Sequence, residues 1–211
     1  PFDEIATQVS QEKAADFHER WVLGYGHASV AEHAVVHLAL ENISRLACDS
    51  LEDNRLASYT EKSSRYQVLD AACYYVPKEL ECEPELAHVY ITACTELFDL
   101  YFRLIDGSMA YLSRVHPQRE NERETAYTLR LRREATDTCR SVLPAATLTN
   151  VGITANARVL EHVISKLMSG SLIEEREVGL EIREQSRTIT PTLIKYAEEN
   201  DYLKSTAQNK W

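Results

Sequence analysis

The sequence contains few of the features that cross-link a chain or anchor it in a membrane. Its five cysteines are widely spread over 211 residues and include no Cys-x-x-Cys pair, which argues against a disulfide framework and a structural zinc site. No apolar run approaches the roughly 18 residues that span a bilayer, and no stretch resembles a signal peptide. We therefore expect reduced, mostly buried thiols, a cytoplasmic location and no membrane partner.

Positive charge is also scarce. The chain has 23 lysines and arginines against 33 aspartates and glutamates, which gives a formal net charge of −10 and a pI near 5.2. A surface this acidic repels polyphosphates, so the composition argues against nucleic acid as a partner. A small anionic ligand remains compatible with it, because a local group of arginines can override the net field.

The length and the 44% apolar content are typical of one globular domain over residues 1–211. Apolar spacing predicts an α+β fold in which helices dominate around a small sheet, without internal repeats. The expected helices are 12–21 (capped by Ser10), 43–51, 84–115, 120–142, 155–168 and one from 172 that breaks at Pro191, and the expected strands or extended pieces are 34–40, 65–69 and 74–76.

Residues 54–66 contain a high density of directional hydrogen-bonding groups. Two arginines, a carboxylate, an amide and four serine or threonine hydroxyls lie within thirteen residues. Arginine offers a planar fork for phosphate or carboxylate, and serine and glutamate offer single directed hydrogen bonds. The stretch therefore favours a pocket for a phosphorylated, planar ligand, although a solvated loop with ordinary surface charges gives the same composition.

A metal site is the alternative that the histidines suggest. His33 and His37 are four residues apart, with Glu32 and His27 nearby, and this spacing puts two ligands on one face of a helix. The local sequence favours a strand, where such residues also share a face. No second histidine–carboxylate pair completes the ligand set, so we expect no metal.

Four blocks in order resemble the flavin-dependent thymidylate synthases, the thymidylate synthase complementing protein family. They are GHASVAEH at 26–33, ENISRLACDSLEDNRLASYTEKSSRY at 41–66, CRSVLP at 139–144 and TANARVLEHV at 154–163. Each block alone is weak, whereas four at matching distances indicate the fold of that family, helix-rich with a small central sheet.

The resemblance implies an activity and its cofactors. The family methylates dUMP to dTMP with methylenetetrahydrofolate, using FAD as hydride carrier and NADPH as reductant. It acts as a homo-oligomer, a dimer or tetramer, with active sites at subunit interfaces. No cysteine of the protein attacks the pyrimidine in that chemistry, so the protein's part is to position and polarise substrate and flavin.

The resemblance also implies roles for residues at matching positions. Ser63, Arg65 and Arg140 match substrate-binding and catalytic positions, and Glu61 lies on the same substrate-facing segment. Ser63 is not an acyl-type nucleophile, since no histidine–carboxylate pair accompanies it. The matching flavin-binding positions are His27, Ser29, Glu32, Arg55, Asn156, Arg158 and His162.

Three positions depart from the family pattern. Asp53 and Asn54 replace the first two members of an Arg-His-Arg triplet, and Leu167 occupies a nucleotide-binding arginine position next to Lys166. Replacing arginine by aspartate beside a phosphate turns an attraction into a repulsion. Each such interaction between unit charges amounts to about 4 kcal/mol at 4 Å and an effective dielectric constant of 20.

These losses lead to two hypotheses. In the first, the chain is half of a longer, duplicated protein whose other half supplies the missing groups. In the second, it is a non-catalytic, degenerate relative that serves as an oligomerisation or partner domain. The sequence leaves open whether this chain alone is an active enzyme.

Overall fold

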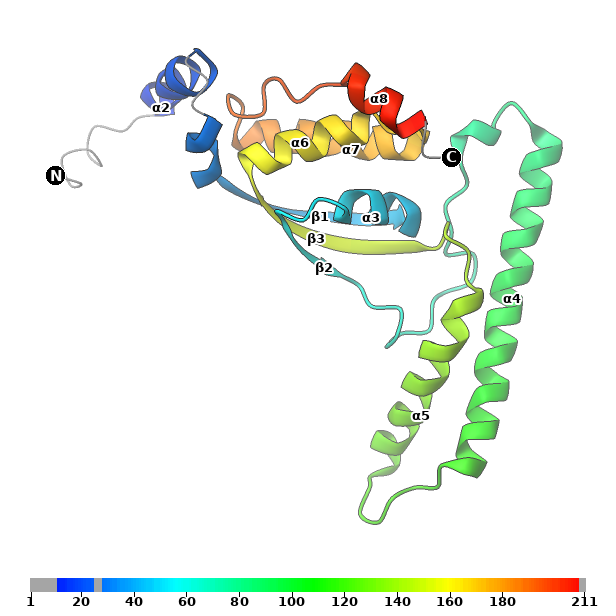
Figure 1. The fold of residues 1–211 in the computed structure, drawn as a ribbon. Coiled ribbons are helices and arrows are strands. Elements are labelled where there is room, and N and C mark those ends of the chain that lie inside the picture. Colours follow the sequence, from blue (N-terminus) through cyan, green and yellow to red (C-terminus); the bar gives the residue numbers. More distant parts are fainter. Residues whose placement is uncertain (1–10, 25–27, 209–211) are drawn as a thin grey trace. The chain divides into compact units, whose positions relative to one another are not determined.

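The computed structural model describes residues 11–24 and 28–208 (Figure 1). Contacts between residues divide the chain into two compact units. Unit 1 comprises Pro1–Leu40, Ala47–Thr60 and Val151–Trp211, and unit 2 comprises Glu41–Leu46 and Glu61–Asn150. We describe each unit separately.

A small antiparallel sheet contains strands β1 (Val35–Ser44), β2 (Ser58–Glu61) and β3 (Leu148–Asn156) in the order β1-β3-β2. Along β3, every second side chain is buried, as expected for a strand with one face against a core. The strand predicted at 34–40 is confirmed and extends further. No strand is predicted after residue 76, so β3 is a correction: its buried residues Thr149, Val151, Ile153 and Ala155 recur at every second position, the period of a strand.

Unit 1 is built mainly from helices. At its carboxyl-terminal end, α6 (Ala157–Met168) packs on α7 (Ile173–Ile189). Gly179 of α7 permits this contact, because a Cβ atom there would lie 3.0 Å from the Leu167 Cβ. The other helical elements that contribute to unit 1 are α2 (Gln11–Phe17), η1 (His18–Gly24), η2 (Ala28–His33), α3 (Arg45–Glu52) and α8 (Asp201–Gln208).

Unit 2 contains a long helical hairpin, α4 (Pro84–Val115) and α5 (Glu124–Cys139), together with the short helices η3 (Lys78–Leu80) and η4 (Arg140–Val142). Pro84 lies in the first turn of α4, where its missing N–H costs nothing. The helix predicted over 84–115 is therefore confirmed. The hairpin encloses a buried apolar cluster of Tyr101, Ile105, Leu112, Leu131, Ala135 and Cys139.

Several predicted boundaries need correction. The helix predicted over 12–21 changes at His18 into a π-helix, and its proposed cap Ser10 lies outside the described residues. The segment 65–69 forms turns and bends rather than a strand. The helix expected over 120–142 begins later, at Glu124. The helix from 172 ends at Ile189, before Pro191, as predicted.

The α+β class with a dominant helical content is confirmed. The five cysteines are free thiols, and three of them, Cys48, Cys94 and Cys139, are buried. Over the described ranges, no helix combines the length and the apolar character needed to cross a bilayer.

Candidate functional site

Two of the predicted substrate-binding arginines meet at one carboxylate in unit 2. The Nε atoms of Arg65 and Arg140 lie 3.4 Å and 3.0 Å from Asp137 Oδ1. Thr136 Oγ1 donates to the Arg65 carbonyl oxygen at 2.7 Å, which ties the 61–70 segment to α5. We call Arg65, Asp137 and Arg140 the arginine cluster. It has two cations against one carboxylate, so it keeps a net positive charge in an acidic protein.

Serine hydroxyls border the arginine cluster. Arg140 Nη1 donates to Ser64 Oγ at 3.4 Å, and the backbone N–H of Arg65 donates to Ser63 Oγ at 3.3 Å. Ser63 and Ser64 also line a cavity of about 180 Å³ together with Arg45 and Lys62. The cavity therefore combines cations with hydroxyls, the groups that bind a phosphorylated ligand.

Glu61 lies at the end of β2 with its carboxylate held by two side chains. Thr149 Oγ1 donates to Glu61 Oε1 at 2.9 Å, and Arg45 forms an ion pair with the same oxygen. This arrangement fixes the carboxylate in one orientation beside the cavity. Arg45 and Asp137 are site residues that the sequence reasoning missed. Asp137 lies three residues before Arg140 on the same helical turn, a spacing at which side chains meet, and this signal was available in the sequence.

The predicted flavin-binding residues that the structure describes all lie in unit 1. Glu32 and Arg158 form an ion pair. Asn156 caps α6, its Oδ1 accepting a hydrogen bond from the Val159 N–H at 2.9 Å, so the expected helix start is confirmed. Ser29 and His162 are exposed, as is Arg55, whereas His27 lies outside the described residues.

The positions that depart from the family pattern have structural partners. Asp53 Oδ2 accepts from Lys166 Nζ at 2.5 Å, so Lys166 is paired rather than open to a ligand. Asn54 is buried, and its Nδ2 donates to the Leu51 carbonyl oxygen at 2.9 Å. Leu167 is buried in the core with 1% of its surface exposed. Asn54 and Leu167, at positions where the resemblance implies ligand contacts, therefore belong to the packed interior.

Tyr59 of β2 lies close to the carboxylates of Glu52 and Asp53. Burial, followed by the negative charges of Glu52 and Asp53, raises the pKa of Tyr59 from 10.0 to about 12. The neutral hydroxyl donates hydrogen bonds to the carbonyl oxygens of Leu51 and Asn54, at 2.9 Å and 3.0 Å. The Tyr59 side chain is therefore held in its neutral form, as a hydrogen-bond donor.

The described residues of unit 1 do not fit the pyrophosphate of FAD on their own. Two of the candidate cations, Arg158 and Lys166, are each neutralised by a carboxylate, and the Asn156 carboxamide oxygen is used by the helix cap. A bound pyrophosphate would meet the charge of Asp53 where the related motif has arginine. A bound pyrophosphate would compete with the carboxylates of these ion pairs.

The histidines predicted as alternative metal ligands are not assembled into a site. His33 ends η2 and His37 lies in β1, so the two do not share a helix face. His37 Nδ1 lies 2.9 Å from Thr154 Oγ1. In the part of the chain that the structure describes, no group of three or more His, Cys, Asp or Glu side chains is placed to hold a metal ion.

Comparison with known proteins adds the family context. The model of the family described as thymidylate synthase complementing protein matches residues 2–192. A UPF0159 protein of Chlamydia muridarum is 34% identical over 196 residues, and the match covers 90% of this chain but 37% of that protein. A UPF0159 protein of Thermoplasma acidophilum is 29% identical over 211 residues, with 88% and 42% covered.

A flavin-dependent thymidylate synthase of Clostridium tetani is 27% identical over 197 residues, which cover 92% of this chain and 75% of that enzyme. The chain thus spans less than half the length of the two UPF0159 proteins. More than half of each of those relatives lies outside the matched region.

Proposed function

Because the chain belongs to the thymidylate synthase complementing protein family, we propose that it binds dUMP and takes part in its methylation to dTMP. The observation that carries this proposal is the convergence of Arg65 and Arg140 beside Ser63 and Ser64. Two guanidinium forks at one point are suited to a phosphate dianion, which accepts several charge-assisted hydrogen bonds at once.

The arginine cluster and its neighbours Ser63 and Glu61 have the following roles in this proposal. Arg65 and Arg140 bind the phosphate, which displaces Asp137 from their guanidinium groups. Ser63 donates a hydrogen bond to the nucleotide and does not act as a nucleophile. Glu61, fixed by Arg45 and Thr149, accepts a hydrogen bond from a donor group of the substrate.

The same proposal includes FAD, NADPH and methylenetetrahydrofolate, with the flavin bound jointly by this chain and another polypeptide segment. Relatives named flavin-dependent thymidylate synthase support a flavin. The paired cations Arg158 and Lys166 argue that contacts to its phosphates come from elsewhere. A second copy in a dimer or tetramer is one source, and the unmatched part of a longer protein is the other. A cytoplasmic location belongs to the same proposal.

A second candidate function is a non-catalytic relative that keeps the scaffold and some nucleotide affinity. The ion pair between Asp53 and Lys166 favours it, because it places a carboxylate on a cation at a position where the family motif has a ligand-binding arginine. Under this alternative the chain acts as an oligomerisation or partner domain for an active copy.

Calorimetric titration with dUMP tests the proposal. We expect saturable binding that weakens by roughly tenfold or more in Arg65→Gln and in Arg140→Gln, since each loses a charge-assisted contact of about 1.5–3 kcal/mol. Arg132→Gln, an exposed arginine on α5, is the matched control and should bind normally. Equal dUMP binding in all four proteins would contradict the proposed site.

A further inference from the structure

The cavity that borders the arginine cluster has polar groups that the proposed phosphate contacts leave unused. Three side-chain carboxamides line it, those of Asn42, Gln67 and Asn150. A carboxamide carries a hydrogen-bond donor beside an acceptor, which matches the donors and acceptors on the edge of a nucleobase. The cavity of about 180 Å³ is smaller than the roughly 300–1,000 Å³ of pockets that enclose a whole ligand. It therefore suits a single ring of a ligand whose charged group lies outside it.

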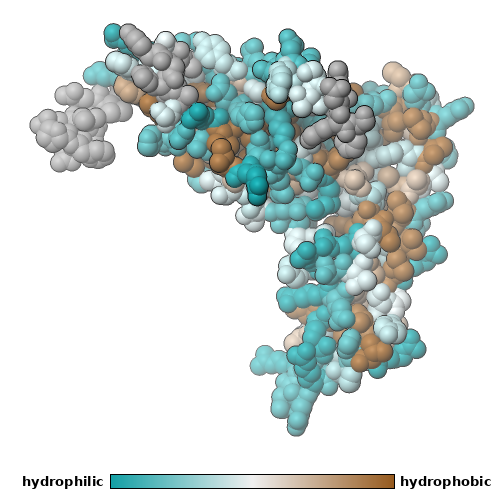
Figure 2. All heavy atoms as spheres, in the orientation of Figure 1, coloured by the Kyte–Doolittle hydropathy of each residue, from teal (hydrophilic) through white to brown (hydrophobic). Residues whose placement is uncertain are grey.

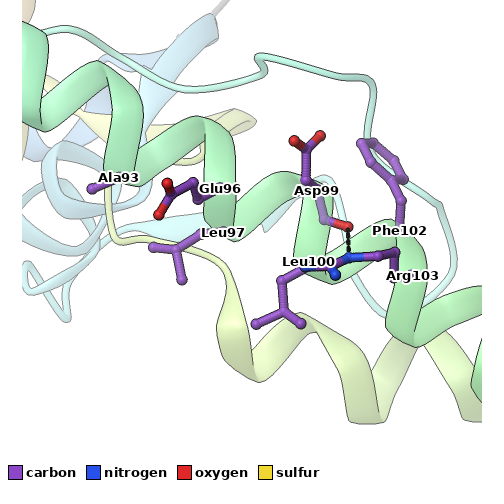
Figure 3. A pocket seen from close by; sticks show the side chains of 7 residues that line it. All are labelled: Ala93, Glu96, Leu97, Asp99, Leu100, Phe102 and Arg103. Carbon is purple, nitrogen blue, oxygen red and sulfur yellow. Dashed lines mark hydrogen bonds between the residues drawn. The ribbon is translucent and has the colours of Figure 1, made fainter.

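Unit 2 also has a larger hollow, on α4, that does not suit a nucleotide. It measures about 880 Å³, and Figure 3 shows Leu97 and Leu100, two of its lining residues, projecting to the same side of the helix. Figure 2 shows apolar side chains (brown) gathered over this helix. A phosphate there would meet the carboxylates of Glu96 and Asp99 against the guanidinium group of Arg103. The smaller, polar cavity is therefore the better place for the base of a nucleotide.

The carboxamide of Asn150 is held in one orientation at the wall of the smaller cavity. Its Oδ1 accepts a hydrogen bond from the backbone N–H of Asn42 at 2.9 Å. Because only the oxygen can accept from an N–H group, this bond decides which end of the carboxamide is which. Within the described part of the chain, Asn150 Nδ2 donates to no protein acceptor. Asn150 thus offers the cavity a fixed donor with no partner in the protein.

The backbone of Asn42 departs from the strand conformation at this hydrogen bond. Its φ angle is 58° although it lies within β1, whereas residues of antiparallel strands have φ near −140°. This left-handed region favours glycine and is tolerated by asparagine. Such conformations persist where the surrounding structure imposes them, and they gather at ligand-binding sites. The conformation of Asn42 supports a functional role for the hydrogen bond that its N–H makes to Asn150.

We propose that Asn150 recognises the pyrimidine of the bound nucleotide, its Nδ2 donating a hydrogen bond to the carbonyl oxygen at C4, and so selects uracil over cytosine. This inference rests on the proposed function, because it assumes that the phosphate lies at the arginine cluster. Ser63 and Ser64 border that cluster and also line the cavity, so one nucleotide can contact both.

The selectivity follows from the fixed orientation of the Asn150 carboxamide. Uracil carries a carbonyl oxygen at C4, an acceptor, and cytosine carries an amino group there, a donor. With cytosine, the amino group would face the amino group of Asn150. Rotating the carboxamide to offer its oxygen would break the hydrogen bond from the Asn42 N–H. A site built for one hydrogen bond therefore rejects the ligand that cannot form it, because polar groups are left unpaired.

Calorimetric titrations with dUMP and dCMP test the inference through the ratio of the two affinities. We expect the unaltered chain to bind dUMP more tightly than dCMP by roughly tenfold or more. Asn150→Asp keeps an acceptor for the Asn42 N–H and replaces the donor with an acceptor, so the ratio should fall by roughly tenfold or more. The added negative charge weakens both ligands alike, because both carry the same phosphate, and its effect cancels in the ratio.

Two further substitutions are the matched controls. Asn121→Asp adds the same charge to unit 2 at an exposed asparagine in the α4–α5 turn, with φ of 67°, and should leave the ratio unchanged. Asn42→Gly keeps the backbone N–H and tolerates φ of 58°, so it should retain the preference for dUMP. A preference lost in Asn42→Gly would assign base recognition to the Asn42 side chain and contradict the role of Asn150.

The remaining outcomes separate this inference from the proposed function. Equal affinities of the unaltered chain for dUMP and dCMP, both weakened in Arg65→Gln, would overturn the role of Asn150 and leave the phosphate site standing. An unchanged ratio in Asn150→Asp would have the same meaning. Binding of neither nucleotide would overturn both proposals. If Asn150→Asp does not fold, Asn150→Ala takes its place, and it should bind dUMP and dCMP with nearly equal affinity because it lacks the donor.

Discussion

Asp137 occupies the point where the two candidate phosphate-binding arginines meet. Both ion pairs are partly exposed, with 53% of the Asp137 side chain accessible, and exposed pairs contribute little to stability. The carboxylate therefore matters more as a competitor for the guanidinium groups than as a stabilising partner. A phosphate dianion that reaches the arginine cluster therefore replaces the single negative charge of Asp137 with a larger one.

Replacing Asp137 by asparagine should raise the affinity for dUMP. The substitution keeps the side-chain shape and removes a charge that opposes the ligand, and two exposed pairs together account for up to ~1 kcal/mol, or about fivefold in affinity. Titrations at low and moderate salt measure the change, which should shrink as salt rises. Weaker binding in Asp137→Asn would instead mean that the carboxylate positions the arginines.

The ion pair of Asp53 with Lys166 leads to a prediction about flavin. Asp53→Asn removes the negative charge and releases the ammonium group of Lys166, which lies within 2.5 Å in the native pair. FAD affinity should therefore rise severalfold, as measured by quenching of flavin fluorescence. Adding Lys166→Gln should abolish the gain. An unchanged affinity in Asp53→Asn would show that the acidic residue is not what limits flavin binding.

Single-residue predictions succeeded where chemistry is local and failed where the partner is distant in sequence. The side chain of Asn156 could be predicted at a helix start because a cap depends on its own turn. The pairing of Asp53 with Lys166 joins residues 113 positions apart, so no local pattern reveals it. Predicted ligand roles of Ser63, Arg65 and Arg140 remain predictions until titration tests them.

At the scale of secondary-structure elements, Glu122 organises the turn of the α4–α5 hairpin. Arg130 donates from Nε and Nη2 to the two carboxylate oxygens of Glu122, each at 2.9 Å. The backbone N–H of Arg119 adds a third bond at 3.0 Å. The hydrogen bonds from Arg130 and then from Arg119 lower the pKa of Glu122 from 4.5 to about 2.

This shift predicts an acid-dependent contribution to hairpin stability. A carboxyl group whose pKa is lowered by folding stabilises the native state above the unfolded pKa of about 4.5 and loses this effect as pH falls toward 2. Glu122→Gln should therefore unfold at lower urea concentration than the unaltered chain at pH 7, and the difference should shrink between pH 4.5 and pH 2. A difference that stays constant over this range would contradict the role of the charge.

Among the elements, the long helices could be predicted and two strands could not. In α4 the apolar positions recur at helical spacing over 32 residues, a signal too long to be accidental. β2 has only four residues and depends on β3 for its hydrogen bonds, so its identity is set by tertiary pairing. β3 ends at Asn156 and α6 begins at the next residue. Because the apolar spacing of α6 starts there, the predicted helix overlaps the end of the strand.

At the scale of the whole molecule, the candidate residues separate by unit. Those matched to the nucleotide, Glu61, Ser63, Arg65 and Arg140, belong to unit 2, and the described ones matched to the flavin belong to unit 1. Unit 2 keeps an uncompensated positive charge at its cluster, whereas unit 1 has neutralised two of its cations. The three departures from the family pattern, Asp53, Asn54 and Leu167, therefore all lie in unit 1.

Parallel calorimetric titrations of the unaltered chain with dUMP, deoxyuridine and FAD are the decisive test of whether the arginine cluster binds the nucleotide phosphate. We expect saturable binding of dUMP, and binding of deoxyuridine weaker by roughly tenfold or more because it lacks the phosphate that the arginines hold. FAD binding should be weak in this chain alone. Equal affinity for dUMP and deoxyuridine, or tight FAD binding without tight dUMP binding, would contradict these expectations.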